Sequence, residues 1–207
     1  MNNEGGLGLT AAILLVGFLL ISATVASVLI GRTETLSDRD LTQMAEKMFE
    51  DISTYLQIRD CVGKYYTIDG EQRIQKIAFL LKPLFASDID AATLTIKLCN
   101  GEQVRMLQYT ENAAFIDSQS LFEHELWDEL PTTSYGFVVL LDKDRSLVNY
   151  GIINDNTDMA YIAIKLPEAF SLKKGDTLTI TLLPAAGIPV SKTVVAPLPI
   201  PKIVSLE

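Results

Sequence analysis

The sequence predicts an α+β chain: a long N-terminal α-helix, hydrophobic and then amphipathic, followed by an antiparallel β-sandwich head domain of the immunoglobulin-like type. Three observations predict this division. They are an uncharged apolar run over residues 7–30, a helical periodicity over 32–60, and short runs of strand-forming residues after residue 61. We therefore expect two domains, an N-terminal helix over 1–60 and a β-sandwich head over 61–207.

The apolar run reads LGLTAAILLVGFLLISATVASVLI and contains no charged side chain. At about 1.5 Å per residue, such a helix is about 36 Å long and can cross the hydrocarbon core of a bilayer. A cleavable secretory signal has a basic start and a shorter apolar stretch of about 7–15 residues. Because residues 1–6 contain no Lys or Arg, we expect the run to remain in the mature chain.

Residues 32–60 contain neither Pro nor Gly. Their apolar side chains, among them Leu41, Met44, Met48 and Ile52, recur at spacings of three and four, and charged residues occupy the remaining positions. This periodicity indicates one apolar stripe along an amphipathic helix. We expect the helix to continue from the apolar run to about Asp60.

The period changes to that of strands after residue 61. Runs rich in β-branched and aromatic residues are separated in many places by Gly, Asn, Asp or Pro, which favours an antiparallel sandwich or barrel. These runs span residues 91–98, 104–109, 137–141, 147–153, 161–166 and 177–183. Residues 72–82 suit either a strand or a short helix. Pro197, Pro199 and Pro201 favour an extended tail on a sheet edge.

An apolar helix that becomes amphipathic, followed by a β head, is the plan of type IV pilin-like subunits. Residues 11–31 (AAILLVGFLLISATVASVLIG) resemble the N-terminal helix of archaellins, the archaeal flagellins. Residues 161–199 resemble the closing pattern of the same family: a strand, a Gly-Asp turn, a strand, a Pro-x-x-Gly segment and a later Pro. Residues 60–160 match no family pattern.

The resemblance implies a structural subunit of the archaellum, the extracellular motility filament on the archaeal cell surface, and not an enzyme. The subunit would polymerise with copies of itself, and with other archaellins where they share the filament. The resemblance also implies a membrane-inserted precursor whose leader is removed by a prepilin-type peptidase. No such leader is present, so the mature chain is expected to begin at or near Met1.

Small side chains within the apolar run permit helices to approach one another closely, as small-xxx-small motifs do in membranes. Three of these small residues, Ala23, Ser27 and Gly31, are spaced four residues apart. Together with the amphipathic stripe they form the expected helix-packing interface: Ala12, Gly17, Ala23, Ser27, Gly31, Leu41, Met44, Met48 and Ile52. In a single-pass membrane anchor, the same small residues would be incidental.

Two other functions suit the same architecture. An adhesive type IV-like pilus subunit would use the helix for assembly and the head for surface binding. A membrane-anchored extracellular domain would bind a small ligand or a surface-layer protein as a monomer. A nucleic-acid partner is not expected, because 17 Lys and Arg stand against 26 Asp and Glu, a net charge of -9.

Catalytic residues are not expected. His124 is the only histidine, and the zinc-protease-like stretch HELWD lacks the second histidine that a metal site needs. Oxygen-rich loops hold the calcium candidates Asp142, Asp144, Asp155 and Asp158. Asp and Asn are also ordinary turn formers, and neither loop follows the EF-hand pattern. The expectation is therefore no cofactor, with calcium as an open alternative.

Cys61 and Cys99 are the only thiols. In an exported β domain, two lone cysteines often form a disulfide, here worth roughly 3–4 kcal/mol by the chain-entropy model. Two free thiols are the alternative, and they suit a reducing habitat. We expect the disulfide.

Overall fold

The computed structural model describes residues 43–48, 54–117, 120–199 and 201–206. Its contacts divide the chain into two units, Met1–Phe49 and Glu50–Glu207. In the first unit, residues 43–48 are helical, and the predicted apolar run lies outside the described residues. Within the described part of the chain, no helix is both long and apolar enough to cross a membrane.

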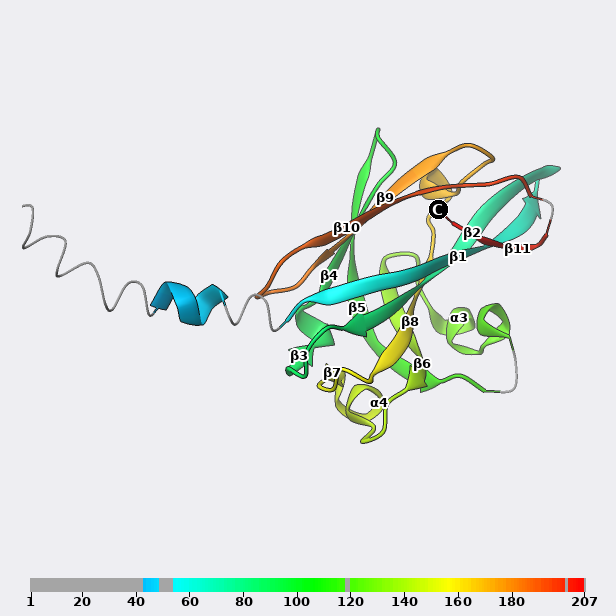
Figure 1. Cartoon of the computed structure of the whole chain (residues 1–207). Coiled ribbons are helices and arrows are strands. Elements are labelled where there is room, and N and C mark those ends of the chain that lie inside the picture. Colours follow the sequence, from blue (N-terminus) through cyan, green and yellow to red (C-terminus); the bar gives the residue numbers. More distant parts are fainter. Residues whose placement is uncertain (1–42, 49–53, 118–119, 200, 207) are drawn as a thin grey trace, which may run out of the picture. The chain divides into compact units, whose positions relative to one another are not determined.

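The second unit is built mainly from strands, which form one nine-stranded sheet in the order β10-β9-β4-β5-β6-β8-β2-β1-β11 and a two-stranded sheet, β3-β7 (Figure 1). The strands of the large sheet are β1 Leu56–Ile68, β2 Glu71–Pro83, β4 Thr95–Cys99, β5 Val104–Phe115, β6 Ser134–Leu141, β8 Met159–Lys165, β9 Thr177–Leu183, β10 Val190–Val195 and β11 Ile203–Ser205. The small sheet pairs β3 Ile89–Asp90 with β7 Ile152–Ile153.

Short helices lie between the strands. The α-helices are α3 Leu126–Glu129 and α4 Ser146–Tyr150, and the 3-10 helices are η1 Ala91–Thr93, η2 Leu121–Glu123 and η3 Glu168–Phe170. The unit is therefore mostly β, as the strand-like runs predict.

One strand pair departs from the predicted antiparallel arrangement, because β5 and β6 are parallel. Two parallel neighbours need a long crossover connection, and the segment between Phe115 and Ser134 supplies it. β5 pairs with β4 through Val104–Leu107 and with β6 further along, with an irregularity between Tyr109 and Ala113. Glu111 has a φ of 59° there. The expectation of a wholly antiparallel sheet is therefore wrong.

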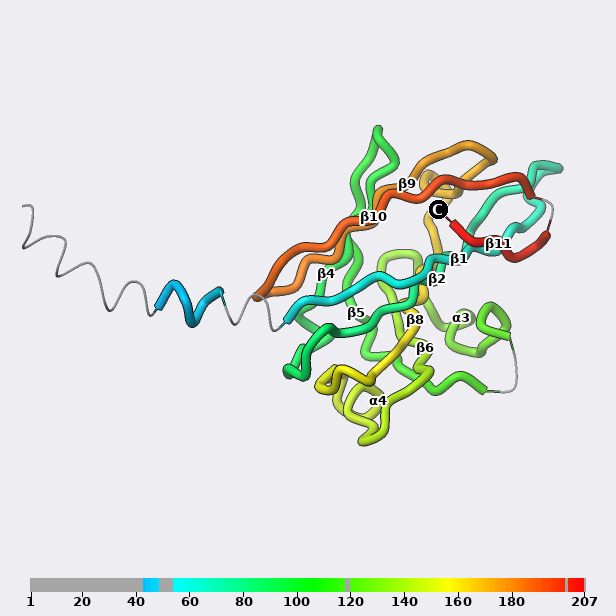
Figure 2. The backbone as a smooth tube through the Cα atoms, viewed as in Figure 1, coloured from blue at the N-terminus to red at the C-terminus, as the bar shows by residue number. Residues whose placement is uncertain are grey.

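The main core lies between the two halves of this sheet. Ile77, Phe79 and Ile162 from β2 and β8 belong to the same buried cluster as Ile96 and Ile180 from β4 and β9. The sheet curls far enough for β1 to contact β10, and the two strands run side by side in Figure 2. Along this seam the Tyr65 hydroxyl donates a 2.6 Å hydrogen bond to the Pro197 carbonyl.

A second, smaller core lies on the opposite face of the sheet. There the crossover segment places Phe122, Leu126 and Trp127 against small residues of the strands, including Ala78 and Ala163. Trp127 stacks on Phe122 with ring centroids 5.6 Å apart, and its indole N–H donates to the Leu121 carbonyl at 2.7 Å. Small strand residues leave the space that these aromatic rings fill.

Two segments differ from their predicted structure. The helix expected to reach Asp60 is wrong from Leu56 onward, because these residues pair with β2 as the start of β1. The predicted strand over 147–153 is mostly α4, and only Ile152–Ile153 is extended. At the start of β1, strand pairing outweighs the local pattern. At α4, hydrogen bonds from the first turn to Asp142 and Asp144 and the left-handed Gly151 at the end favour the helix. The undecided residues 72–82 are in β2, and the tail carries β11 on the edge of the sheet, as predicted.

Replacing Gly136 with Ala should destabilise the head. A Cβ at this position would lie 2.8 Å from the Asn112 carbonyl oxygen and 3.3 Å from Leu126 Cδ2. Because that carbonyl belongs to β5, the clash pushes β5 and β6 apart, and we expect a loss of about 1–3 kcal/mol in the free energy of unfolding. Urea denaturation followed by circular dichroism measures it. A loss below about 0.5 kcal/mol, typical of surface substitutions, would contradict the close contact.

Candidate assembly surfaces

Most of the predicted helix-packing residues cannot be placed. Ala12, Gly17, Ala23, Ser27, Gly31, Leu41 and Ile52 lie outside the described residues. Met44 and Met48 are described, and they are 63% and 65% exposed on the helical residues 43–48. Side chains four apart lie on the same face of a helix. The pair therefore presents an exposed apolar stripe in the first unit.

The first oxygen-rich loop follows β6 and supports α4. Asp142 is buried, and its carboxylate accepts hydrogen bonds from the amides of Ser146, Leu147 and Val148 at 3.1–3.3 Å. Burial raises the pKa of Asp142, against the lowering effect of the Val148 and Leu147 amides. Asp144 accepts from the Asn154 side-chain amide at 2.8 Å and from the Ser146 amide, which lowers its pKa to about 2. Both carboxylates thus hold the start of the helix.

The second oxygen-rich loop precedes β8. Asp158 is buried and accepts from the amides of Asn154 and Asp155, while Asp155 accepts from the Thr157 amide at 2.8 Å. Burial raises the pKa of Asp158, whereas the bond from Thr157 lowers that of Asp155. The Asp155 bond is that of an ordinary Asx turn, and Asp158 closes the loop from its far end. Across the described ranges, no three His, Cys, Asp or Glu side chains are grouped to hold a metal ion.

His124 has a structural position. Its Nδ1 accepts a hydrogen bond from the Leu126 amide at 3.1 Å, and its Nε2 lies 3.0 Å from the Phe115 carbonyl oxygen, to which it donates. Both ring nitrogens are therefore occupied within the crossover segment. The neighbouring Glu125, Asp128 and Glu129 are exposed. His124 therefore links the end of β5 to the start of α3.

The Cys61–Cys99 disulfide expected from the sequence is not formed. Both cysteines are free thiols, Cys61 buried on β1 and Cys99 half-buried at the end of β4. The two strands are separated by β5, β6, β8 and β2 in the order of the sheet. Burial raises the pKa of Cys61 to about 12, so its thiol stays protonated and unreactive.

Sequence reasoning missed a row of lysines on the outer face of the sheet. Lys64 on β1 pairs directly with Lys76 on β2, and Lys76 pairs directly with Lys165 on β8. We call these three residues the lysine row. They are widely spaced along the chain, so only the strand register brings them together, and no local pattern in the sequence indicates them.

Comparison with known proteins agrees with this architecture. A family model described as archaeal-type flagellin matches residues 5–194. Flagellin B3 of Methanocaldococcus jannaschii is 25% identical over 174 residues, which cover 82% of this chain and 79% of the relative. Flagellin B3 of Methanococcus voltae is 23% identical over an alignment that covers 91% of this chain and 89% of the relative.

Among solved structures, the crystal structure of archaeal flagellin FlaB1 from Methanocaldococcus jannaschii resembles this fold. It matches with a TM-score of 0.65 and 21% identity, over 73% of this chain and 95% of that one. At this identity the match shows the fold alone. The family match extends over nearly the whole sequence, so the chain belongs to the archaeal-type flagellin family and is a structural subunit of the archaellum filament.

Proposed function

We propose that the subunit polymerises through its N-terminal helix, with residues 1–55 in the filament core and the β head from Leu56 onward on the filament surface. The family match supports the filament role. The observation that carries the division of labour is the completeness of the head, which buries its own apolar residues in two internal cores. Apolar burial is worth about 1.5–3 kcal/mol per large side chain, and the helix must find that burial in other subunits.

The helix part of the proposal is a continuous helix that is first apolar and then amphipathic. Exposed Met44 and Met48 on the helical residues 43–48 support it, because a neighbouring helix would cover them. Before assembly, the apolar run over 7–30 would hold the precursor in the membrane, where a prepilin-type peptidase would remove a leader. Other archaellins would be able to join the same filament through equivalent helices.

The head part of the proposal is an immunoglobulin-like sandwich in overall layout, modified by the parallel β5–β6 pair. The two halves of the curled sheet supply its two layers. We expect the head to carry no enzymatic activity and to need no cofactor.

Replacing Ser27 with Phe tests the helix proposal. Ser27 belongs to the small residues at spacings of four, and a phenyl ring there would block close helix approach while keeping the run apolar. In cells that lack the native gene, the Phe variant should remain membrane-associated, form no filaments and give no swimming. Electron microscopy of sheared cell-surface material and motility assays measure this.

Ser27→Ala is the matched control, because it keeps a small side chain, and it should assemble and swim as the native chain does. Normal filaments from Ser27→Phe would contradict close packing at this position. If the native chain itself restores neither filaments nor motility, the archaellum assignment fails as a whole.

A further inference from the structure

The lysine row is an unfavourable arrangement for an isolated subunit. Directly opposed residues of neighbouring strands project from the same face of a sheet, and like charges in such pairs are destabilising. Here three positive charges follow one another across β1, β2 and β8. The chain as a whole has 17 basic and 26 acidic residues, so a row of three lysines calls for an explanation.

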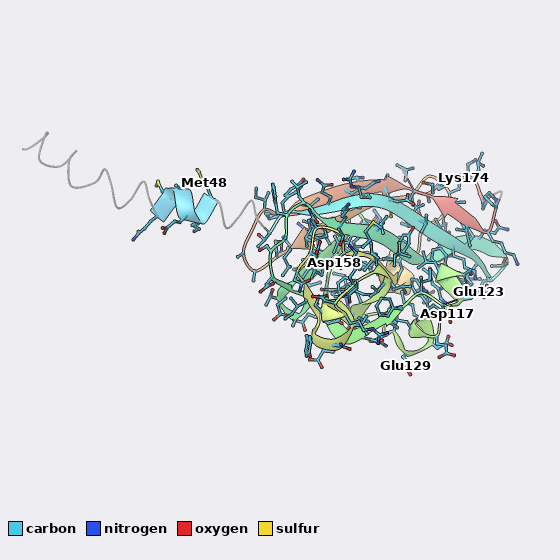
Figure 3. All side chains as sticks on the ribbon, turned by 60° about the horizontal axis from the view of Figure 1, so that its bottom comes forward. Met48, Asp117, Glu123, Glu129, Asp158 and Lys174 are labelled. Atoms are coloured by element: carbon cyan, nitrogen blue, oxygen red, sulfur yellow. The ribbon has the colours of Figure 1, made fainter. Side chains whose placement is uncertain are left out.

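Neighbouring groups of the same subunit neutralise the row only in part. Lys64 forms a 2.9 Å ion pair with Glu123, an exposed residue labelled in Figure 3. Lys76 lies 5.0 Å from the ring centroid of Trp127, and Asp128 adds a favourable charge. The positive charge of Lys202 also lowers the pKa of Glu123. The ammonium groups of Lys64, Lys76, Lys165 and Lys202 therefore outnumber the two carboxylates beside them, Glu123 and Asp128.

The pKa of Lys76 reflects the same excess of positive charge. Burial lowers the pKa of Lys76, and the positive charges of Lys64 and Lys165 lower it further. Its ammonium group also lies 5.8 Å from the ring centroid of Tyr66 and 3.5 Å from the Phe122 carbonyl oxygen. Aromatic faces and a carbonyl oxygen stabilise a cation without neutralising it.

An open groove begins beside the lysine row. It has a volume of about 530 Å³ and lies between the outer part of the β1–β2 hairpin and the proline-rich segment before β11. Its lining residues are Lys64, Tyr65, Tyr66, Thr67, Gln72, Pro199, Pro201 and Lys202. Two lysines at a groove of this size offer ammonium groups to carboxylate side chains that enter from outside.

Exposed carboxylates gather at the opposite end of the same strands. β8 runs from Met159 to Lys165, so its two ends are about 20 Å apart at 3.3 Å per residue. At the Met159 end lie the loops around β3, β7 and α4, which carry four exposed acidic residues that we call the acidic rim: Asp88, Asp90, Asp144 and Asp155. The rim also carries exposed Lys143 and Arg145, and its four carboxylates outnumber these two cations.

We propose that the lysine row and its groove bind the acidic rim of a second copy of this chain in the filament. This inference rests on the filament role but adds a contact between heads to the assembly of helices. A basic end that binds an acidic end is a heterologous contact, and contacts of that kind repeat into an open helical array. It brings together oppositely charged surfaces of subunits that otherwise repel one another through a net charge of -9.

Charge reversal of Lys165 tests the contact. In the full chain, Lys165→Glu should raise the thermal midpoint of the unassembled subunit, because it removes one like-charge pair. It should also lower the fraction of subunit recovered in sheared filaments by about tenfold at low salt. A merely structural lysine would not move these two quantities in opposite directions. Lys97→Glu on β4 is the matched control, since Lys97 is also a half-buried strand lysine, and it should assemble as the native chain does.

A second reversal provides the rescue. Asp88→Lys alone should reduce assembly as Lys165→Glu does, and the double variant should recover most of the native filament yield. The inference is overturned if Lys165→Glu and Lys97→Glu filaments are equally abundant, or if the double variant shows no recovery. It is also overturned if the row binds inorganic phosphate or anionic lipid vesicles while filament yield stays unchanged. Failure of the native chain to form filaments would instead overturn the proposed function.

Discussion

A chain that begins at Thr54 is expected to be a soluble, β-rich monomer that forms no filaments. It keeps every strand of the head, including β1 from Leu56, and both internal cores. It loses the apolar run over 7–30 and the exposed Met44 and Met48. The stabilising burial of the head is internal, whereas that of the helix comes from other subunits. Circular dichroism and sedimentation measure the fold and the mass.

The stability of the isolated head depends on the residue at which the shortened chain begins. A chain beginning at Cys61 would lose the first part of β1, which pairs with the end of β2 from Leu56 to Asp60, and it should be less stable than the chain beginning at Thr54. A chain that ends at residue 53 should require detergent. Filaments formed by the isolated head would show that the helix is not the polymerising element, and the proposed division of labour would fail.

Replacing Trp127 with Ala should cost the head about 3–5 kcal/mol, a large part of the total stability of a domain. Trp127 is only 1% exposed and fills the second core together with Phe122 and Leu126. Its loss leaves a cavity and frees the Leu121 carbonyl, to which the indole N–H donates. It also removes the ring beneath the ammonium group of Lys76. The crossover segment should then detach from the sheet before the main core unfolds.

Trp127→Phe is the control, because it keeps an aromatic ring against Phe122 while losing the indole donor. It should cost clearly less than Trp127→Ala in urea denaturation, and hydrogen exchange should show protected amides in the crossover segment. Equal and small losses for the two variants would mean that the second core adds little to stability.

Much of the head could be predicted from its sequence, because strand-forming runs mark β6, β8 and β9 to within three residues. The run over 91–98 begins on η1 before β4, and the run over 104–109 covers only the first half of β5. Residues 72–82 are ambiguous in the sequence because their apolar spacing suits both a strand and a helix. The Asp69–Gly70 pair is a sequence signal for a β-hairpin. In the structure both residues have positive φ, 50° and 82°, in the tight turn between β1 and β2. That turn indicates a strand just before Asp69, whereas the extension of β1 back to Leu56 depends on its pairing with the far end of β2.

Some features of the candidate sites could be predicted from the sequence, and others could not. Turn formation by Asp144 and Asp155 could be inferred from residue type. The absence of the disulfide could not, because it depends on which strands are neighbours. The lysine row is the clearest example of this limit. Its members are 12 and 89 positions apart along the chain, and only the pairing of β1, β2 and β8 sets them opposite one another.

The sequence alone indicated the family through its resemblance to archaellins, and it determined the mostly β character of the head, because strand-forming runs are local patterns that period encodes. Tertiary structure alone decided the start of β1, the parallel β5–β6 pair, the fate of the two thiols and the convergence of like charges. The physical reason is the range of the interactions. Hydrophobic period acts over neighbouring residues, whereas register, crossover connections and charge clustering depend on strands that meet only after the chain has folded.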